Sequence, residues 1–345
     1  MPILEPLVEG ATRDSVGRRL SLDMAGLSHL DTFGACLLHG LMHGRDVLGA
    51  DTLPEDLRGL LAAVDRAEAA QPPEPPKAAR PLAAIENVGR ATIGAGRELV
   101  GFVAMLGALG EAFVRALAQP RRFRPISIVH QLDRVGLQAV PIICLITLLI
   151  GGIIAQQGIF HFRRFGASDY AVDMVGILVL RELGVLLVAI MVAGRSGSAY
   201  TAELGSMKMR EEIDALRTMG LDPVEILLLP RVIALVFALP ALALLGALAA
   251  LVGGGLAEWL YGGMNPAVFV MRLRDAVSIT QFEVGIIKAP FMALAIGVVA
   301  CSEGLAVQGS AESLGVETTA SVVKSIFLVI VLDGVFAIFF AGIGM

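Results

Sequence analysis

Four ionisable residues stand inside long apolar stretches of the sequence. Arg181 and Glu182 lie near the middle of AVDMVGILVLRELGVLLVAIMVAG (171–194), and Lys288 and Asp333 lie in two later stretches. A charge at the centre of a bilayer costs about 2.5 to 3.5 kcal/mol on an insertion scale, so we expect these side chains to turn inward and either pair or line a wet cavity. Such a cavity could contact a charged or amphipathic substrate. The alternative is that the four charges are ties between helices that only fix their packing.

The cost of these charges is balanced by their surroundings. The Val, Ile and Leu residues of 171–194 favour insertion by about 4 to 8 kcal/mol in total. The net free energy of inserting this segment alone is therefore close to zero. The charges of the four residues sum to zero, which makes mutual pairing economical. Lys288 has a second option, because a shift of its span would let the long side chain reach the membrane surface.

The composition is that of a membrane protein. Of the 345 residues, 56% are hydrophobic and 17% are charged, whereas about a quarter are charged in soluble domains. The net charge of -5 lacks the basic excess of a nucleic-acid binder. The three cysteines lie far apart and imply no disulfide framework. No basic and apolar leader opens the chain, so we expect an N-terminus that stays in the cytosol.

Apolar stretches of about 20 residues are the unit that crosses a bilayer, and five of them follow residue 82. The stretch 85–118 carries too much charge for a span and suits an amphipathic helix in the membrane interface. We therefore predict a mainly α polytopic membrane protein with one interfacial helix and five transmembrane helices. The expected spans are 138–157, 171–194, 225–256, 282–303 and 321–343.

The distribution of Lys and Arg predicts how the chain crosses the membrane, because cytoplasmic flanks are enriched in them. One side holds eight such residues and the other holds four. This excess predicts a cytosolic N-terminus and an outward-facing C-terminus. The eight are Arg121, Arg122, Arg124, Arg134, Arg195, Lys208, Arg210 and Arg217, and the four are Arg163, Arg164, Arg272 and Arg274.

The region 1–70 is more polar than the rest of the chain. Its segment LSLDM (20–24) predicts a short buried strand, and DTFGACLLHGLMHG (31–44) predicts a helix that Asp31 or Thr32 caps. This strand, turn and helix resemble the second half of a STAS domain. We therefore expect a small, partial STAS-like α/β module on the cytosolic side.

The segment QPPEPPKAARP (71–81) is typical of a stiff, extended linker. It separates the polar N-terminal region from a membrane domain over 82–345. The sequence thus predicts three parts of different character.

A charged stretch between the second and third expected spans is the most informative polar segment. It is TAELGSMKMREEIDALRTMGLDP (201–223), and its final Gly and Asp-Pro form a helix stop signal. Its mixture of Met and aliphatic residues with charges suits a helix that docks in the groove of a partner, although simple loop structure is the alternative. We expect this docking helix over 203–219, with contacts by Glu203, Met207, Glu211, Glu212, Asp214 and Arg217.

Small residues at the end of the second expected span predict close helix packing. Gly194, Gly197 and Ser198 would let neighbouring backbones approach. They belong to the run AGRSGSA (193–199).

No motif predicts catalysis in this chain. The sequence lacks a P-loop, a G-x-S-x-G elbow and an HExxH pair. His39 and His43 have the spacing of two metal ligands on one helix, but no further ligand accompanies them, so we expect no metal. If transport is driven by ATP, the hydrolysing subunit must be another polypeptide.

Two long runs resemble the MlaE/YrbE permeases of ABC-type lipid transporters. The first is RELGVLLVAIMVAGRSGSAYTAELGSMKMREEIDALRTMGLDP (181–223), and the second is GLAVQGSAESLGVETTASVVKSIFLVIVLD (304–333). The similarity extends from about residue 85 to the C-terminus. Val185 departs from the family, which usually has Pro at that position.

The resemblance implies a homodimeric permease in the bacterial inner membrane, with its C-terminus in the periplasm. It would bind two copies of an ATPase subunit, which carries the ATP and Mg, and a periplasmic MCE-domain ring, and it would move phospholipids between the inner membrane and the outer envelope. The segment 203–219 would be the coupling helix that contacts the ATPase. The residues of the lipid-handling cavity would be Arg181, Glu182, Lys288 and Asp333.

Two other function classes remain open at this point. An ATP-independent channel or secondary transporter would work without an ATPase partner. A membrane-anchored scaffold built around the STAS-like module would lose its function when residues 1–80 are deleted. Five spans with buried charges exceed what an anchor needs.

Overall fold

A computed structural model describes residues 20–21, 34–36, 47–48, 59–64, 66, 80–118, 125–167 and 170–344. The chain divides into two compact units, Met1–Val88 and Gly89–Met345.

In the first unit, two short strands pair. β1 (Leu20–Ser21) and β2 (Val47–Leu48) run parallel, with Leu20 opposite Val47. β1 falls within the strand expected at 20–24. Asp31, Thr32, His39, His43 and most of the linker lie outside the described residues, so the STAS-like module and its cap stay predictions.

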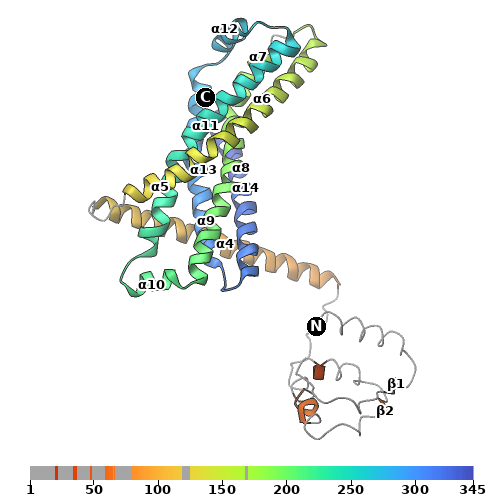
Figure 1. Ribbon diagram of the computed structural model, residues 1–345. Coiled ribbons are helices and arrows are strands. Elements are labelled where there is room, and N and C mark those ends of the chain that lie inside the picture. The colour runs from red at the N-terminus through yellow and green to blue at the C-terminus, as the bar shows by residue number, and fades with distance from the viewer. Residues whose placement is uncertain are drawn as a thin grey trace. The chain divides into compact units, whose positions relative to one another are not determined.

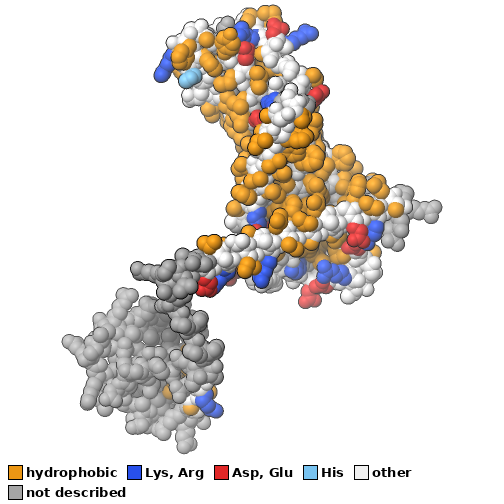
Figure 2. Space-filling model, turned by 180° about the vertical axis from the view of Figure 1, so that it is seen from behind, with side chains coloured by type: hydrophobic (Ala, Val, Ile, Leu, Met, Phe, Trp, Pro, Cys, Tyr) orange, Lys and Arg blue, Asp and Glu red, His pale blue; other side chains and the backbone are white. Residues whose placement is uncertain are grey.

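The second unit is helical, and the described residues include six helices long and apolar enough to cross a membrane. Four of them contain the first four predicted spans, and a fifth covers 321–343 except for its last residue. Apolar side chains cover the middle of this unit, whereas charged side chains gather mainly near its two ends (Figure 2). The six helices are Glu86–Ala118, Pro125–Arg163, Tyr170–Met209, Val224–Gly262, Ile279–Ala306 and Ala311–Gly342.

The sixth candidate is the helix predicted to lie in the membrane interface. α4 (Arg80–Ala118) has 39 residues, so its length and composition alone would also allow it to span. Within the second unit, Figure 1 shows α4 running crosswise to the other long helices. Ion pairs tie it to the bundle, from Glu98 to Lys324 at 3.1 Å and from Arg115 to Asp222 at 2.7 Å. The crosswise course agrees with an interfacial position, which stays a prediction.

Two of the long helices, Tyr170–Met209 and Val224–Gly262, each contain two π-helical turns, which are frequent at functional sites. These turns are η4, η5, η6 and η7, and they interrupt otherwise regular α-helix. The elements of the bundle after α4 are α5 (Pro125–Val135), η3 (Leu137–Ala139), α6 (Val140–Arg163), α7 (Tyr170–Leu178), η4 (Val179–Leu183), α8 (Gly184–Val192), η5 (Ala193–Gly197), α9 (Ser198–Met209), α10 (Glu212–Thr218), η6 (Val224–Leu228), α11 (Leu229–Ala257), η7 (Glu258–Gly262), α12 (Pro266–Ala276), α13 (Ile279–Ala306) and α14 (Ala311–Gly342).

The prediction of one continuous helix over 203–219 is wrong, while its docking role stays a prediction. Its first part is the end of α9, and its second part is the separate short helix α10. The chain turns between them at Glu211, whose φ of 58° is left-handed and unusual for a residue with a side chain. The predicted stop is present, because α10 ends at Thr218 and Gly220 adopts a φ of 75°.

The core of the bundle depends on close approach of α6 and α11. A Cβ on Gly151 would lie 2.0 Å from the carbonyl oxygen of Ala250, and one on Gly253 would lie 1.9 Å from that of Leu148. Reciprocal glycines thus let the two backbones touch, as small residues do in membrane helix pairs. Buried residues that include Ala155 of α6, Val175 of α7 and Ala250 of α11 form an apolar cluster beside this contact.

Candidate functional site

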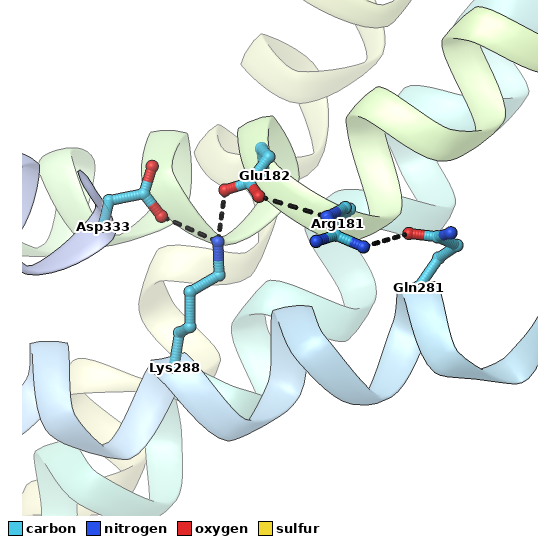
Figure 3. Close-up of polar contacts among 5 residues, drawn as sticks. All are labelled: Arg181, Glu182, Gln281, Lys288 and Asp333. Carbon is cyan, nitrogen blue, oxygen red and sulfur yellow. Dashed lines mark hydrogen bonds and ion pairs between the residues drawn. The ribbon is translucent and has the colours of Figure 1, made fainter. Parts of the chain in front are cut away.

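The four intramembrane charges meet between three spans. Lys288 on α13 is fully buried, and its Nζ donates to Asp333 Oδ1 on α14 at 2.8 Å and to Glu182 Oε2 in η4 (Figure 3). A buried ammonium held by two carboxylates from other helices avoids the cost of an unpaired charge. Lys288 therefore does not reach the membrane surface, which was the other option for this residue.

Arg181 extends the cluster on the other side of Glu182. Its Nε lies 3.4 Å from Glu182 Oε1, and its Nη1 donates to Gln281 Oε1 on α13 at 3.1 Å. The side chains of Arg181, Glu182 and Asp333 retain 20%, 23% and 14% of their exposure, whereas Lys288 retains none. The accessible face of the cluster is thus formed by both signs of charge, with the ammonium behind them.

Sequence reasoning missed Gln281 because a neutral amide in a span has no large insertion cost. A signal for it exists in the spacing. Gln281 and Lys288 lie two helical turns apart, so they share one face of α13. That face points at the charged turn of the second span.

Local backbone features position the cluster. Arg181 and Glu182 both lie in the π-turn η4, and in Figure 3 Arg181 points toward Gln281 while Glu182 points toward Lys288. α13 comes very close to this turn, because a Cβ on Gly285 would lie 2.2 Å from the carbonyl oxygen of Leu180. Gly285 is one turn before Lys288, so this approach brings the ammonium within reach of Glu182.

The structure gives no support for a metal centre in the part of the chain that it describes. None of the described residues form a group of three or more His, Cys, Asp or Glu side chains that could hold an ion. His39 and His43 lie outside those residues.

A second ionic network lies where α9 leaves the apolar region. Glu203 pairs with Arg134 of α5 and with Arg231 of α11, the latter at 3.3 Å. Arg231 is 7% exposed, and its guanidinium carbon lies 5.7 Å from the ring centre of Tyr200. Glu203 was predicted to contact a partner, but its carboxylate is engaged within the chain. It therefore joins three elements at the base of the bundle.

Replacing Glu203 with Gln should lower the stability of the bundle by about 2 kcal/mol, because the nearly buried Arg231 loses its carboxylate. Thermal unfolding in detergent measures the change. Glu212→Gln is the matched control, since its partner Arg210 is 65% exposed and such pairs contribute less than about 1 kcal/mol. Equal unfolding midpoints for the two variants would contradict a stabilising role of Glu203.

The other predicted docking residues lie on α10, next to it or, in the case of Met207, on the end of α9. Glu211, Asp214 and Arg217 are exposed, and Arg217 pairs with Asp214 at 3.1 Å. Met207 and Glu212 are partly buried and line a cavity of about 410 Å³ at the base of α9. These side chains form a polar surface at one end of the bundle.

The predicted packing residues behave differently from one another. A Cβ on Gly197 would lie 3.4 Å from Ile296 of α13, which is ordinary close contact. Ser198 Oγ donates to the carbonyl oxygen of Gly194 at 2.5 Å and so supports its own helix. Gly194 differs from the prediction, because a Cβ there would meet nothing within 4 Å. Its small size leaves open space in the single chain instead of a helix contact.

Comparisons with known proteins agree with this architecture. The model of the family described as Permease MlaE matches residues 128–339. The chain is 32% identical over 254 residues to the intermembrane phospholipid transport system permease protein MlaE of Haemophilus influenzae, covering 72% of this chain and 97% of that protein.

Other relatives are similar at the same level. A probable ABC transporter permease protein of Rickettsia conorii is 30% identical over 220 residues, covering 64% of this chain and 85% of that one. The chloroplastic protein trigalactosyldiacylglycerol 1 of Arabidopsis thaliana is 30% identical over 231 residues, covering 67% and 65% of the two chains. With its family match over most of the bundle and its six long apolar helices, this chain belongs to the MlaE permease family and is a multi-pass inner-membrane permease of the ABC transporter type.

Proposed function

We propose that this chain is the membrane-spanning subunit of an ATP-driven transporter that moves phospholipids between the inner membrane and the outer envelope. The observation that carries the proposal is the charged cluster around Lys288, which lies between apolar spans and keeps both signs of charge accessible. The name of the Haemophilus influenzae relative, a permease of a phospholipid transport system, points to the same substrate.

The chemistry of the cluster suits a lipid headgroup. A phosphate diester carries one negative charge that a guanidinium binds through parallel hydrogen bonds. Arg181 is partly exposed, and its contacts with Glu182 and Gln281 orient its guanidinium. A phosphate that reaches the cluster would therefore meet a guanidinium that is already positioned to bind it. Glu182 and Asp333 remain to face the positive end of a zwitterionic headgroup. Acyl chains would lie against the apolar walls of the spans.

A second copy of the chain would complete the cavity. The buried residues of α14 are only Ser321, Ser325, Val329 and Phe340, although most of the helix after Lys324 is apolar. Its exposed apolar side chains include Val323, Phe327 and Ile338, at 61%, 68% and 78% exposure. Since Asp333 belongs to the same helix, two copies that pack their second and fifth spans together would enclose both charged clusters.

The energy would come from partner subunits. The exposed surface of α10 and the end of α9 would contact an ATPase that binds ATP and Mg, and motion there would favour one of two states of the cavity. The Arg115–Asp222 pair connects this region to α4. A periplasmic MCE-domain ring would receive or deliver lipid on the opposite side. In this arrangement the N-terminus is cytosolic, the C-terminus is periplasmic, and the chain holds no cofactor.

Reversing the charge of Glu182 tests the role of the cluster. Glu182→Lys should abolish ATP-dependent phospholipid transfer, because three cations then face one carboxylate, while assembly with the ATPase continues. Transfer of labelled phospholipid from proteoliposomes and copurification of the ATPase measure the two properties. Glu283→Lys is the control, since Glu283 is exposed on the same span as Lys288. Normal transfer by Glu182→Lys would leave the cluster only a packing role.

The same assay separates the other function classes. Transfer that continues without ATP or without any ATPase subunit would favour a channel or secondary transporter. Loss of transfer only on deletion of residues 1–80 would favour a scaffold. Under our proposal, the deletion variant keeps part of its ATP-dependent transfer.

A further inference from the structure

A partly apolar groove lies away from the Lys288 cluster. It has a volume of about 250 Å³ and opens between the start of α6 and the junction of α8 with η5. Ile142, Ile143, Met191 and Val192 form its apolar walls. Arg195 lines it as well, about 20 Å along the helix from Glu182. The groove therefore combines an apolar wall with a cation at one end.

The position of Arg195 marks the edge of the apolar region. It directly follows the apolar run 171–194, and on the other wall the apolar run of α6 begins only after Arg134. Both walls thus change from polar to apolar at the same level, which is where lipid headgroups meet acyl chains. The exposed aliphatic residue Ile142, at 48% exposure, lies on the apolar side of this level.

The guanidinium of Arg195 is available for a ligand. The side chain is exposed, and none of the carboxylates in the described part of the chain lies within ion-pair distance of it. This contrasts with Arg134, Arg181 and Arg231, each of which pairs with a glutamate. An unpaired arginine at headgroup level attracts a phosphate, to which its planar fork of donors is complementary.

Gly194 supplies the room for such a ligand. It lines the groove beside Arg195, and a Cβ at this position would meet no atom within 4 Å. A larger side chain would therefore occupy the groove without colliding with the chain itself. This makes the space and the charge separately testable.

We propose that this groove binds one phospholipid from the leaflet on the α10 side, with its phosphate on Arg195 and an acyl chain along Ile142 and Met191. The occupant is identified by complementary charge and by the level at which the apolar walls begin. The inference builds on the proposed function in one respect, because a lipid held here would be the form that the transporter exchanges with the surrounding membrane. Binding itself requires neither ATP nor transfer.

Photolabelling tests the proposal on the full chain in nanodiscs of phosphatidylethanolamine and phosphatidylglycerol. A trace of phosphatidylglycerol with a diazirine on one acyl chain is activated, and labelled peptides are identified by mass spectrometry. We expect labelling on the peptides that contain Ile142 and Met191. Arg195→Gln should reduce it roughly tenfold by removing charge-assisted hydrogen bonds. Gly194→Leu should reduce it as strongly by filling the groove.

Matched controls separate these effects from general changes. Arg97→Gln removes an exposed arginine from α4, and Gly110→Leu adds a side chain at a glycine with nothing within 4 Å. Both should label as the unmodified chain does. Thermal unfolding midpoints equal to that of the unmodified chain show that the groove variants are folded. A diacylglycerol with the same diazirine chain but no phosphate should label weakly and should not respond to Arg195→Gln.

Three results would overturn the proposal. One is undiminished labelling of the groove peptides in Arg195→Gln, and another is equal labelling by the diacylglycerol probe. The third is a disulfide between copies when Ile142→Cys is oxidised, which would mean that a second copy fills the groove. Because labelling needs no ATP, its failure is distinguishable from loss of transfer in Glu182→Lys, and either result can occur without the other.

Discussion

Replacing Lys288 with Met should abolish phospholipid transfer and lower the free energy of unfolding by about 3 to 5 kcal/mol. Methionine keeps most of the volume of lysine but removes the ammonium that holds Glu182 and Asp333. Two carboxylates then face each other between spans with only Arg181 nearby. Transfer is measured from proteoliposomes, and stability is measured by thermal unfolding in detergent.

A double variant separates the loss of phospholipid transfer from the loss of stability. Lys288→Met with Asp333→Asn removes one positive and one negative charge, so Arg181 and Glu182 again balance. We expect most of the stability to return, because no carboxylate is left unpaired, while transfer remains lost. Return of transfer together with stability would mean that the cluster only fixes packing. Unchanged stability in the single Lys288→Met variant would contradict the ion pairs themselves.

The charged cluster could be predicted from the sequence because placing charges in a membrane costs a large amount of free energy. Several kcal/mol of insertion penalty predict that Arg181, Glu182, Lys288 and Asp333 turn inward, and the structure brings all four together. Which of the four side chains pair with each other could not be predicted. Lys288 as the shared donor depends on how α13, η4 and α14 approach each other, and no local pattern encodes that approach.

The places of the apolar spans along the chain were predictable, but the ends of the helices and the irregularities within them were not. Each of the five apolar runs coincides with one long helix of the structure, and only 321–343 passes its end, by one residue. The π-turn η4 has no compositional signature, since an i to i+5 hydrogen bond requires no special residue. The turn at Glu211 was missed for a related reason. Neither Gly nor Pro stands there, so local propensity favours a continuous helix and tertiary contacts override it.

Unpaired arginine is a feature that only the structure reveals. The sequence counts Arg195 among eight cations that orient the chain, and nothing distinguishes it from Arg134. Packing distinguishes them, because Arg134 reaches Glu203 while Arg195 faces a groove. Packing also decides the role of Gly194, which was predicted to contact a neighbouring helix. In the fold it lines the groove beside Arg195, and a Cβ there would meet no atom within 4 Å.

Replacing Gly253 with Ala should destabilise the bundle by about 3 kcal/mol or more, the upper part of the range for overpacked sites. The new Cβ would lie 1.9 Å from the carbonyl oxygen of Leu148 and 3.1 Å from the amide nitrogen of Gly152. Both neighbours are backbone atoms, so no side-chain rotation relieves the contact. α6 and α11 must separate, and the apolar cluster beside them loses contact along its length.

Reaction of Cys301 with a thiol-reactive dye measures this effect, because Cys301 is fully buried and becomes reactive only on unfolding. Cys36 and Cys144 are first replaced by Ser, since Cys36 is exposed and Cys144 is partly exposed. Gly110→Ala is the control, as a Cβ there meets nothing within 4 Å and alanine favours helix by about 0.5 to 1 kcal/mol. The two substitutions add the same methyl group to helical glycines, so their midpoints should move in opposite directions. If they move together, helix propensity governs both sites and the α6–α11 backbone contact does not control the stability of the bundle.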